Sequence, residues 1–159
     1  MKKARVTIDR NSIFQMVQDD VTELTHVEQV IDSWQNCFSY KSSGPDSQGL
    51  RPAQLGALFS IKAHWTVSNE PATIVMPTGT GKTETMIATV VSEQINKTLI
   101  IVPSNLLRKQ TVEKFMSFGV LQELGVINSA AQKPSVASLV TTPKELSDLQ
   151  TIIDNSNVI

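Results

Sequence analysis

A short glycine-rich stretch carries the clearest chemistry of the sequence, at residues 77–84 with the letters P-T-G-T-G-K-T-E. An apolar run precedes it and a helix-forming segment follows it, which is the strand–loop–helix context of a phosphate-binding loop. Gly79 and Gly81 allow backbone angles that are closed to other residues, so consecutive N–H groups can turn toward phosphate oxygens. The N-terminus of the following helix adds free donors and partial positive charge. The stretch therefore predicts a site for a nucleoside triphosphate.

The side chains of the loop divide the work of binding such a ligand. Lys82 would bring its ammonium to the outer phosphates, and the Thr83 hydroxyl is placed to ligate Mg²⁺. Lys82 and Thr83 are therefore the catalytic candidates, with Thr83 as the metal ligand and with ATP and Mg²⁺ as the cofactors. The alternative is an ordinary glycine-rich turn whose lysine and threonine are simply solvated. The cofactor-binding residues expected within the loop are Thr78, Gly79, Thr80, Gly81, Lys82, Thr83 and Glu84.

Composition limits the class of protein. At 159 residues, with 40% hydrophobic and 18% charged residues, the chain is in the range of one globular domain. The formal net charge of −1 gives no overall basic field, so nucleic-acid binding would have to be local. The single cysteine, Cys37, excludes an internal disulfide and a cysteine-cluster metal site. Because the sequence shows no membrane-spanning run and no signal peptide, we expect a cytoplasmic protein without a membrane partner.

Residues 1–45 are expected to form a small, mostly helical N-terminal appendage that ends in a linker. The alternating piece at 5–9 predicts a short strand, and the apolar spacing at 13–17 suggests one or two helical turns. A longer helix is expected from Thr25, because Thr25 and Glu28 have the spacing of a capping box. The apolar face of that helix consists of Val27, Val30, Ile31, Trp34 and Phe38.

The turn-rich segment 41–49, K-S-S-G-P-D-S-Q-G, is the clearest break in the chain. We expect an ATP-binding domain to occupy residues 46–159. Its first helix starts at Pro52, a residue suited to a first helical position, and its many apolar side chains predict that it is largely buried. Gln54 in the first turn carries an amide donor and acceptor, the pair needed to read the N6 and N7 edge of adenine. An exposed first-turn glutamine is the simpler interpretation.

The rest of the chain alternates predicted strands and helices. The run Thr98–Val102 lacks alternation, as expected for a parallel strand buried on both faces. Strand, helix and strand in this order imply right-handed crossovers and a parallel sheet, hence an α/β fold. Strands are expected at 74–76, 98–102 and 136–140, and a further strand is expected to begin at 157–159. Helices are expected after the phosphate loop, after Ser104 and after Thr142.

Three segments together resemble the first motor domain of superfamily 2 helicases and translocases, particularly the helicase subunits of type III restriction enzymes. Residues 50–54, L-R-P-A-Q, resemble the adenine-reading element of that group. Residues 76–83 resemble its motif I, in which a non-glycine commonly stands where Met76 departs from the strict phosphate-loop pattern. Residues 99–110, L-I-I-V-P-S-N-L-L-R-K-Q, resemble its motif Ia. The order of the three segments makes the resemblance specific.

The resemblance implies a three-layer, parallel-sheet, RecA-like domain with a phosphate loop, incomplete in this chain. Arg51 and Gln54 would then bind adenine. The motif Ia-like loop would contact the nucleic-acid backbone. The residues expected to make that contact are Ser104, Asn105, Arg108 and Gln110. The simpler interpretation of the same loop is a helix cap at Ser104 and a solvated helix face at Arg108 and Lys109.

The family's acidic motif II, which holds Mg²⁺ and orients the attacking water, is missing from the sequence. Asp154 in T-I-I-D-N comes nearest, but Asn155 stands where the glutamate belongs. Motif III and the second motor domain are also absent. We therefore expect the N-terminal part of an ATP-dependent helicase or translocase, inactive alone, whose partners are double-stranded DNA and a missing C-terminal motor domain.

Two alternatives remain from the sequence. The first is a non-catalytic module that uses the phosphate-loop fold as an interaction platform, which the missing acidic motif favours. The second is a small phosphoryl-transferring kinase, which would need a lid with several arginines. Only Arg108 follows Lys82 as an arginine, and this argues against the kinase.

Overall fold

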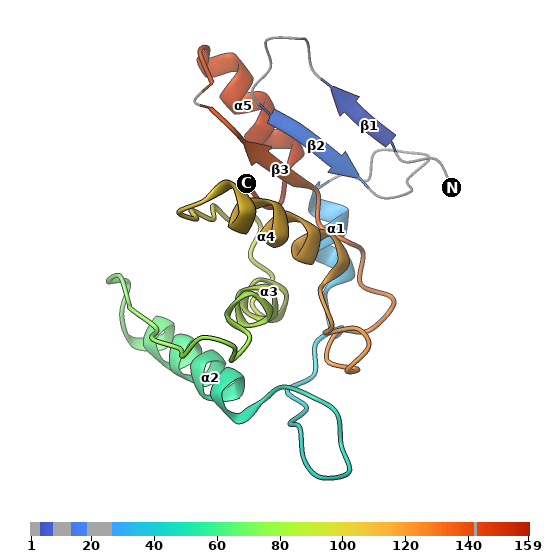
Figure 1. Cartoon of the computed structure of the whole chain (residues 1–159), viewed down its shortest axis with the longest axis vertical. Helices are drawn as coiled ribbons and strands as arrows, with labels where there is room; N and C mark the ends of the chain where they lie inside the picture. The colour runs from blue at the N-terminus through green and yellow to red at the C-terminus, as the bar shows by residue number, and fades with distance from the viewer. Residues whose placement is uncertain (1–3, 8–13, 19–26, 142) are drawn as a thin grey trace.

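The computed structural model of the protein describes residues 4–7, 14–18, 27–141 and 143–159. Figure 1 shows the strands and α5 at one end of an elongated molecule and α2 at the other, with α3 and α4 between them. Among the helices of the described residues, none has the length and apolar character needed to cross a membrane. The elements are β1 (Ala4–Thr7), β2 (Phe14–Gln18), α1 (Val27–Ser33), α2 (Pro52–Val67), α3 (Lys82–Ser92), α4 (Asn105–Ser117), β3 (Val136–Leu139) and α5 (Leu146–Asn155).

The three strands form one antiparallel sheet in the order β1-β2-β3. The central strand β2 pairs with β1, where Gln18 lies opposite Ala4, and with β3, where Phe14 lies opposite Leu139. The N-terminal strands are therefore joined to the C-terminal half of the chain through β3. The strand predicted from the alternating residues near the N-terminus is confirmed by β1.

The prediction of helical turns at 13–17 is wrong, because the described part of this segment forms β2. A single isolated helical turn fixes several dihedral angles for few hydrogen bonds, whereas β2 has a hydrogen-bonded neighbour on each side. The longer helix is confirmed by α1 but ends at Ser33. Phe38, expected in the same helix, instead forms an antiparallel bridge with Ile127. Thr25, its expected cap, lies outside the described residues.

Parallel pairing, the arrangement expected of the whole sheet, is limited to isolated bridges in the described residues. Val158 pairs in parallel with Thr98 on one side and with Val136 on the other. The Thr98 N–H donates to the Asn157 carbonyl, and the Ile159 N–H donates to the Thr98 carbonyl, each at 2.9 Å. Three segments predicted as strands therefore do lie side by side. They form a narrow parallel ribbon and not the wide parallel sheet of a three-layer domain.

The strand expected at 74–76 is not formed, and the one expected at 98–102 is paired only near its start. Ile101 is 85% exposed, which contradicts the expected burial of segment 98–102 on both faces, and Val75 in the first segment is 87% exposed. A strand is stable when a neighbouring segment pairs with its backbone groups and covers its side chains. Within the described part of the chain, no backbone hydrogen bond joins residues 71–76 to another segment.

The core lies among α1, α3, α4 and the turns after α4. The indole of Trp34 meets the ring of Phe118 edge to face at 6.3 Å, and its N–H donates to the Gln132 carbonyl at 2.8 Å. The prediction that Trp34 belongs to the core is therefore confirmed. The largest fully buried side chains include Trp34, Phe115, Phe118, Leu50, Ile87, Leu121, Ile127 and Ile152.

Helix α2 is not largely buried, contrary to the sequence prediction. Ala57 and Leu58 are buried, whereas Phe59 and Trp65 remain about half exposed. The apolar residues of α2 are distributed around the helix, and in the described structure the helix packs mainly on α3. One apolar side of α2 is therefore left uncovered.

Helix α5 begins later than expected, and a lysine from another segment caps its C-terminus. It starts at Leu146, not near residue 142, which lies outside the described residues. At its other end the Lys97 ammonium donates to the carbonyls of Ile153, Asp154 and Ser156, the last at 2.9 Å. The final carbonyls of a helix lack partners and carry partial negative charge, which a cation offsets. Desolvation lowers the pKa of Lys97 from its usual value.

Candidate functional site

The glycine-rich stretch folds into a tight turn before a helix, as predicted. Gly79 and Gly81 have φ values of 80° and 88°, in the left-handed region that favours glycine. Gly81 is the N-cap of α3, and Lys82 and Thr83 are the first residues of the helix. The turn therefore ends at a helix N-terminus with open backbone donors, which is the geometry of an anion-binding site.

A cavity of about 900 Å³ opens beside this turn. Its volume is within the roughly 300–1,000 Å³ typical of small-molecule sites. It brings together all the predicted cofactor-binding residues except Thr80, which belongs to the loop but does not line the cavity. The lining residues include Arg51, Gln54, Thr78, Gly79, Gly81, Lys82, Thr83, Glu84, Leu107 and Lys114.

Arg51 and Gln54 hold the loop against the start of α2. The Arg51 guanidinium donates to the Gly79 carbonyl at 2.7 Å. The Gln54 Nε2 donates to the Gly81 carbonyl at 3.2 Å, and the Gln54 Oε1 accepts from the Arg51 backbone N–H at 2.9 Å. Gln54 is buried, so the interpretation as an exposed first-turn glutamine is wrong. Its amide can offer a base one further N–H and one further lone pair.

Lys82 is exposed, and its ammonium donates to the Pro77 carbonyl at 2.9 Å. The Thr80 hydroxyl donates to the same carbonyl at 2.6 Å. Two side chains of the loop therefore donate to a carbonyl at the start of the same loop. A hydrogen bond of an exposed group contributes little net free energy, so a phosphate oxygen could replace Pro77 as the partner of Lys82 at small cost.

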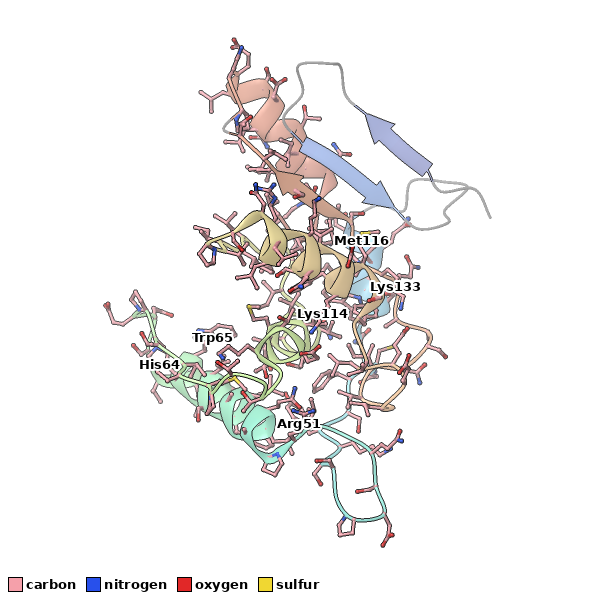
Figure 2. All side chains as sticks on the ribbon, viewed as in Figure 1. Arg51, His64, Trp65, Lys114, Met116 and Lys133 are labelled. Atoms are coloured by element: carbon pink, nitrogen blue, oxygen red, sulfur yellow. The ribbon has the colours of Figure 1, made fainter. Side chains whose placement is uncertain are left out.

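Glu84 follows Thr83 in α3 and forms an ion pair across to α4. Its Oε1 lies 2.6 Å from the Nζ of Lys114. Figure 2 shows Lys114 between α4 and α3, and Arg51 beyond α3 next to α2. Sequence reasoning named Glu84 but missed Lys114, because the two residues are 30 positions apart and no local pattern indicates which helices meet.

Thr83 is half-buried and lines the cavity. The described residues contain no group of three or more His, Cys, Asp or Glu side chains that could hold a metal ion by themselves. Mg²⁺ in nucleotide sites commonly takes one or two protein ligands and completes its shell with phosphate oxygens and water. A single hydroxyl therefore fits a Mg²⁺ that arrives with a triphosphate. Asp154, which accepts from Gln150 on the exposed side of α5, does not line the cavity.

The sequence model of one protein family matches residues 47–157, which is more than half of the chain. The family is described as the type III restriction enzyme, res subunit. The chain belongs to this family. The res-subunit family implies a helicase-like, ATP-dependent function in general and a RecA-like phosphate-loop fold. The described residues show the loop and helices of such a fold without its parallel sheet. Neither a curated protein nor a solved structure matches the chain.

The residues that the res-subunit resemblance predicts to contact nucleic acid do not all face the same way. Ser104 caps α4, and its hydroxyl accepts from the Leu107 N–H at 3.3 Å, as the simpler interpretation expected. Asn105 and Gln110 are exposed. Arg108 is half-buried and lines a second, apolar cavity of about 230 Å³ between α4 and the parallel ribbon.

The turn-rich segment before α2 also lines the cavity beside the glycine-rich turn, through Ser43, Ser47 and Gln48. Sequence reasoning treated this segment as a linker and missed that role. Gly49 marks the reason why the segment can pack closely, because a Cβ there would collide with the backbone of Lys41. The sequence signal for this role is Gly49, a glycine that stands between a polar run and a leucine.

Proposed function

We propose that this member of the res-subunit family is the N-terminal, ATP-binding part of an ATP-dependent helicase or translocase. One observation carries the proposal. A loop with two glycines at positive φ ends at the N-terminus of α3, inside a cavity that Arg51 and Gln54 also line. Family membership supports the general class, and this cavity supports ATP as the ligand. In a full RecA-like domain the parallel ribbon would be part of a wider parallel sheet between two layers of helices.

In this proposal the triphosphate lies along the loop. Lys82 exchanges the Pro77 carbonyl for the outer phosphates, and the N-terminal amides of α3 donate to the same oxygens. Thr83 ligates the Mg²⁺ that accompanies the triphosphate, and this ion would offset part of the phosphate charge. Gln54 uses its remaining N–H and lone pair on the edge of adenine, with Arg51 beside it.

Nucleic acid would bind at the start of α4. Ser104 still has its O–H to donate, and Asn105 is exposed beside the amides of the helix N-terminus. Gln110 is exposed more than one turn further along α4. We propose double-stranded DNA as the partner, contacted through its phosphates. Arg108 would have to turn out of its apolar cavity to join this contact.

Hydrolysis would need groups that this chain does not supply to the cavity. Among the described lining residues, the carboxylates are those of Glu84 and Glu123, and Glu84 is already paired with Lys114. We therefore propose that the chain binds Mg-ATP without turning it over. A C-terminal motor domain would complete the enzyme, which we expect to work in the cytoplasm.

Calorimetric titration with Mg-ATP tests this proposal on the whole chain and on Lys82→Ala. Losing a charge-assisted contact should weaken binding about tenfold or more. Equal affinities for the two proteins would contradict the assigned role of the loop. A steady-state ATPase assay tests the other half, since a rate that Lys82→Ala abolishes would show that the chain is catalytic by itself.

A further inference from the structure

The cations that line the cavity at the phosphate loop are Arg51, Lys82 and Lys114. Arg51 lies next to α2, and Lys114 belongs to the last turn of α4 (Figure 2). Lys114 lines the cavity together with Lys82 and Thr83. Neither the phosphate-loop pattern nor the motif Ia-like segment includes Lys114, so its place at the cavity wall calls for a role.

Glu84 holds Lys114 in place. The two side chains meet at 2.6 Å, and the exposed fraction is 12% for Glu84 and 44% for Lys114. Glu84 is a buried residue of α3, so the surrounding atoms restrict its carboxylate. The pair therefore fixes the ammonium of an otherwise flexible side chain at the wall of the cavity.

The ammonium of Lys114 keeps donors for a ligand. A lysine has three N–H donors, and the carboxylate of Glu84 takes one of them. The side chain of Lys114 is accessible to solvent, so a ligand in the cavity can reach the ammonium. An anion that enters the cavity can therefore bind Lys114 without breaking the ion pair.

We propose that Lys114 is a second phosphate-binding cation of this cavity and that Glu84 positions it. The inference rests on the proposed function and adds one premise, that the phosphates of an ATP with its base at Gln54 extend along the loop toward α4. A monophosphate would end before Lys114, and each added phosphate would bring negative charge closer to it. Lys114 therefore makes the site prefer a triphosphate.

Calorimetric titration of the full chain with AMP, ADP and ATP in the presence of Mg²⁺ tests this. Lys114→Met removes the charge and keeps an apolar stem, and it should weaken ATP binding about tenfold while changing AMP binding by less than about twofold. The matched control is Lys109→Met, the same charge change at an exposed position of the same helix. Lys114→Arg keeps the cation and should retain most of the ATP affinity.

A double-mutant comparison tests the part assigned to Glu84. In the Glu84→Gln background, Lys114→Met should weaken ATP binding by less than it does in the wild-type background, because the lysine is no longer held at the wall. The same loss in both backgrounds would show that Glu84 does not position Lys114.

The outcomes separate this inference from the proposed function. ATP binding that Lys82→Ala weakens but Lys114→Met leaves unchanged would overturn the role of Lys114 alone. Equal weakening of AMP, ADP and ATP by Lys114→Met, or a melting temperature well below that of Lys109→Met, would assign Lys114 to the fold and also overturn it. Absence of nucleotide binding by the wild-type chain would overturn both.

Discussion

The glycine-rich loop at 77–84 and the two extended segments at 74–76 and 98–102 match their sequence predictions to different degrees. The loop has the turn, the glycine conformations and the helix start that its letters predict. The extended segments have the apolar residues of strands but little of the pairing. A turn and a helix form hydrogen bonds within a few residues, whereas a strand depends on a neighbour from elsewhere. Local chemistry therefore predicts the first kind of structure more securely.

The sharpest contrast between the two regions is expected from isoleucine truncations. Ile87 in α3 is fully buried, whereas Ile101 in the second extended segment is almost fully exposed. Ile87→Ala should lower the free energy of unfolding by about 2–5 kcal/mol, because it leaves a cavity in the core. Ile101→Ala should change it by less than about 0.5 kcal/mol. Urea denaturation measures both, and a large loss for Ile101→Ala would show that this segment is covered in solution.

Alanine substitutions of Gly81 and Gly56 test whether the loop requires a glycine at Gly81. Gly81→Ala places a Cβ at a φ of 88° and against the Gln54 amide, and should destabilise the protein by about 1–3 kcal/mol and abolish ATP binding. Gly56→Ala, in an open position of α2, should stabilise it by about 0.5–1 kcal/mol. Thermal denaturation distinguishes the two signs, and losses of similar size would contradict a special role for Gly81.

A smaller loss of stability is expected from a substitution of Lys97, which lies next to the parallel ribbon. Lys97→Met removes three contacts to the end of α5 and should cost about 1–2 kcal/mol in urea denaturation. Lys109→Met, at an exposed position, is the control and should be neutral. Equal stabilities of the two variants would show that the α5 cap contributes nothing measurable.

The same lysine predicts a pH dependence. Desolvation lowers the pKa of Lys97 from 10.5, so just below pH 10.5 the unfolded state binds more protons there than the folded state. Stability conferred through Lys97 should therefore rise with pH across that window, and fall as pH drops through the lowered pKa. The wild-type chain should show this slope relative to Lys97→Met, and parallel curves for the two proteins would count against it.

The sequence predicted the helices and the loop better than the sheet, for reasons visible in particular residues. Pro52, Gly81 and Ser104 mark helix starts through their own conformation or side chain, and each helix begins beside them. β2 was misread because its apolar spacing also fits a helical turn. Lys114 was missed because long-range packing, not local pattern, brings it to Glu84. The exposure of α2 likewise depends on what lies against it.

The exposed apolar residues of the two extended segments affect how the protein behaves in concentrated solution. Val75, Leu99 and Ile101 stand on backbone that has few internal partners, and such edges readily pair with other chains. Concentrated solutions should therefore self-associate slowly through β-type contacts, more so on warming, since apolar attraction strengthens with temperature. Dilute, cold storage and a lysine in place of Val75 would keep the sample monodisperse for the binding measurements.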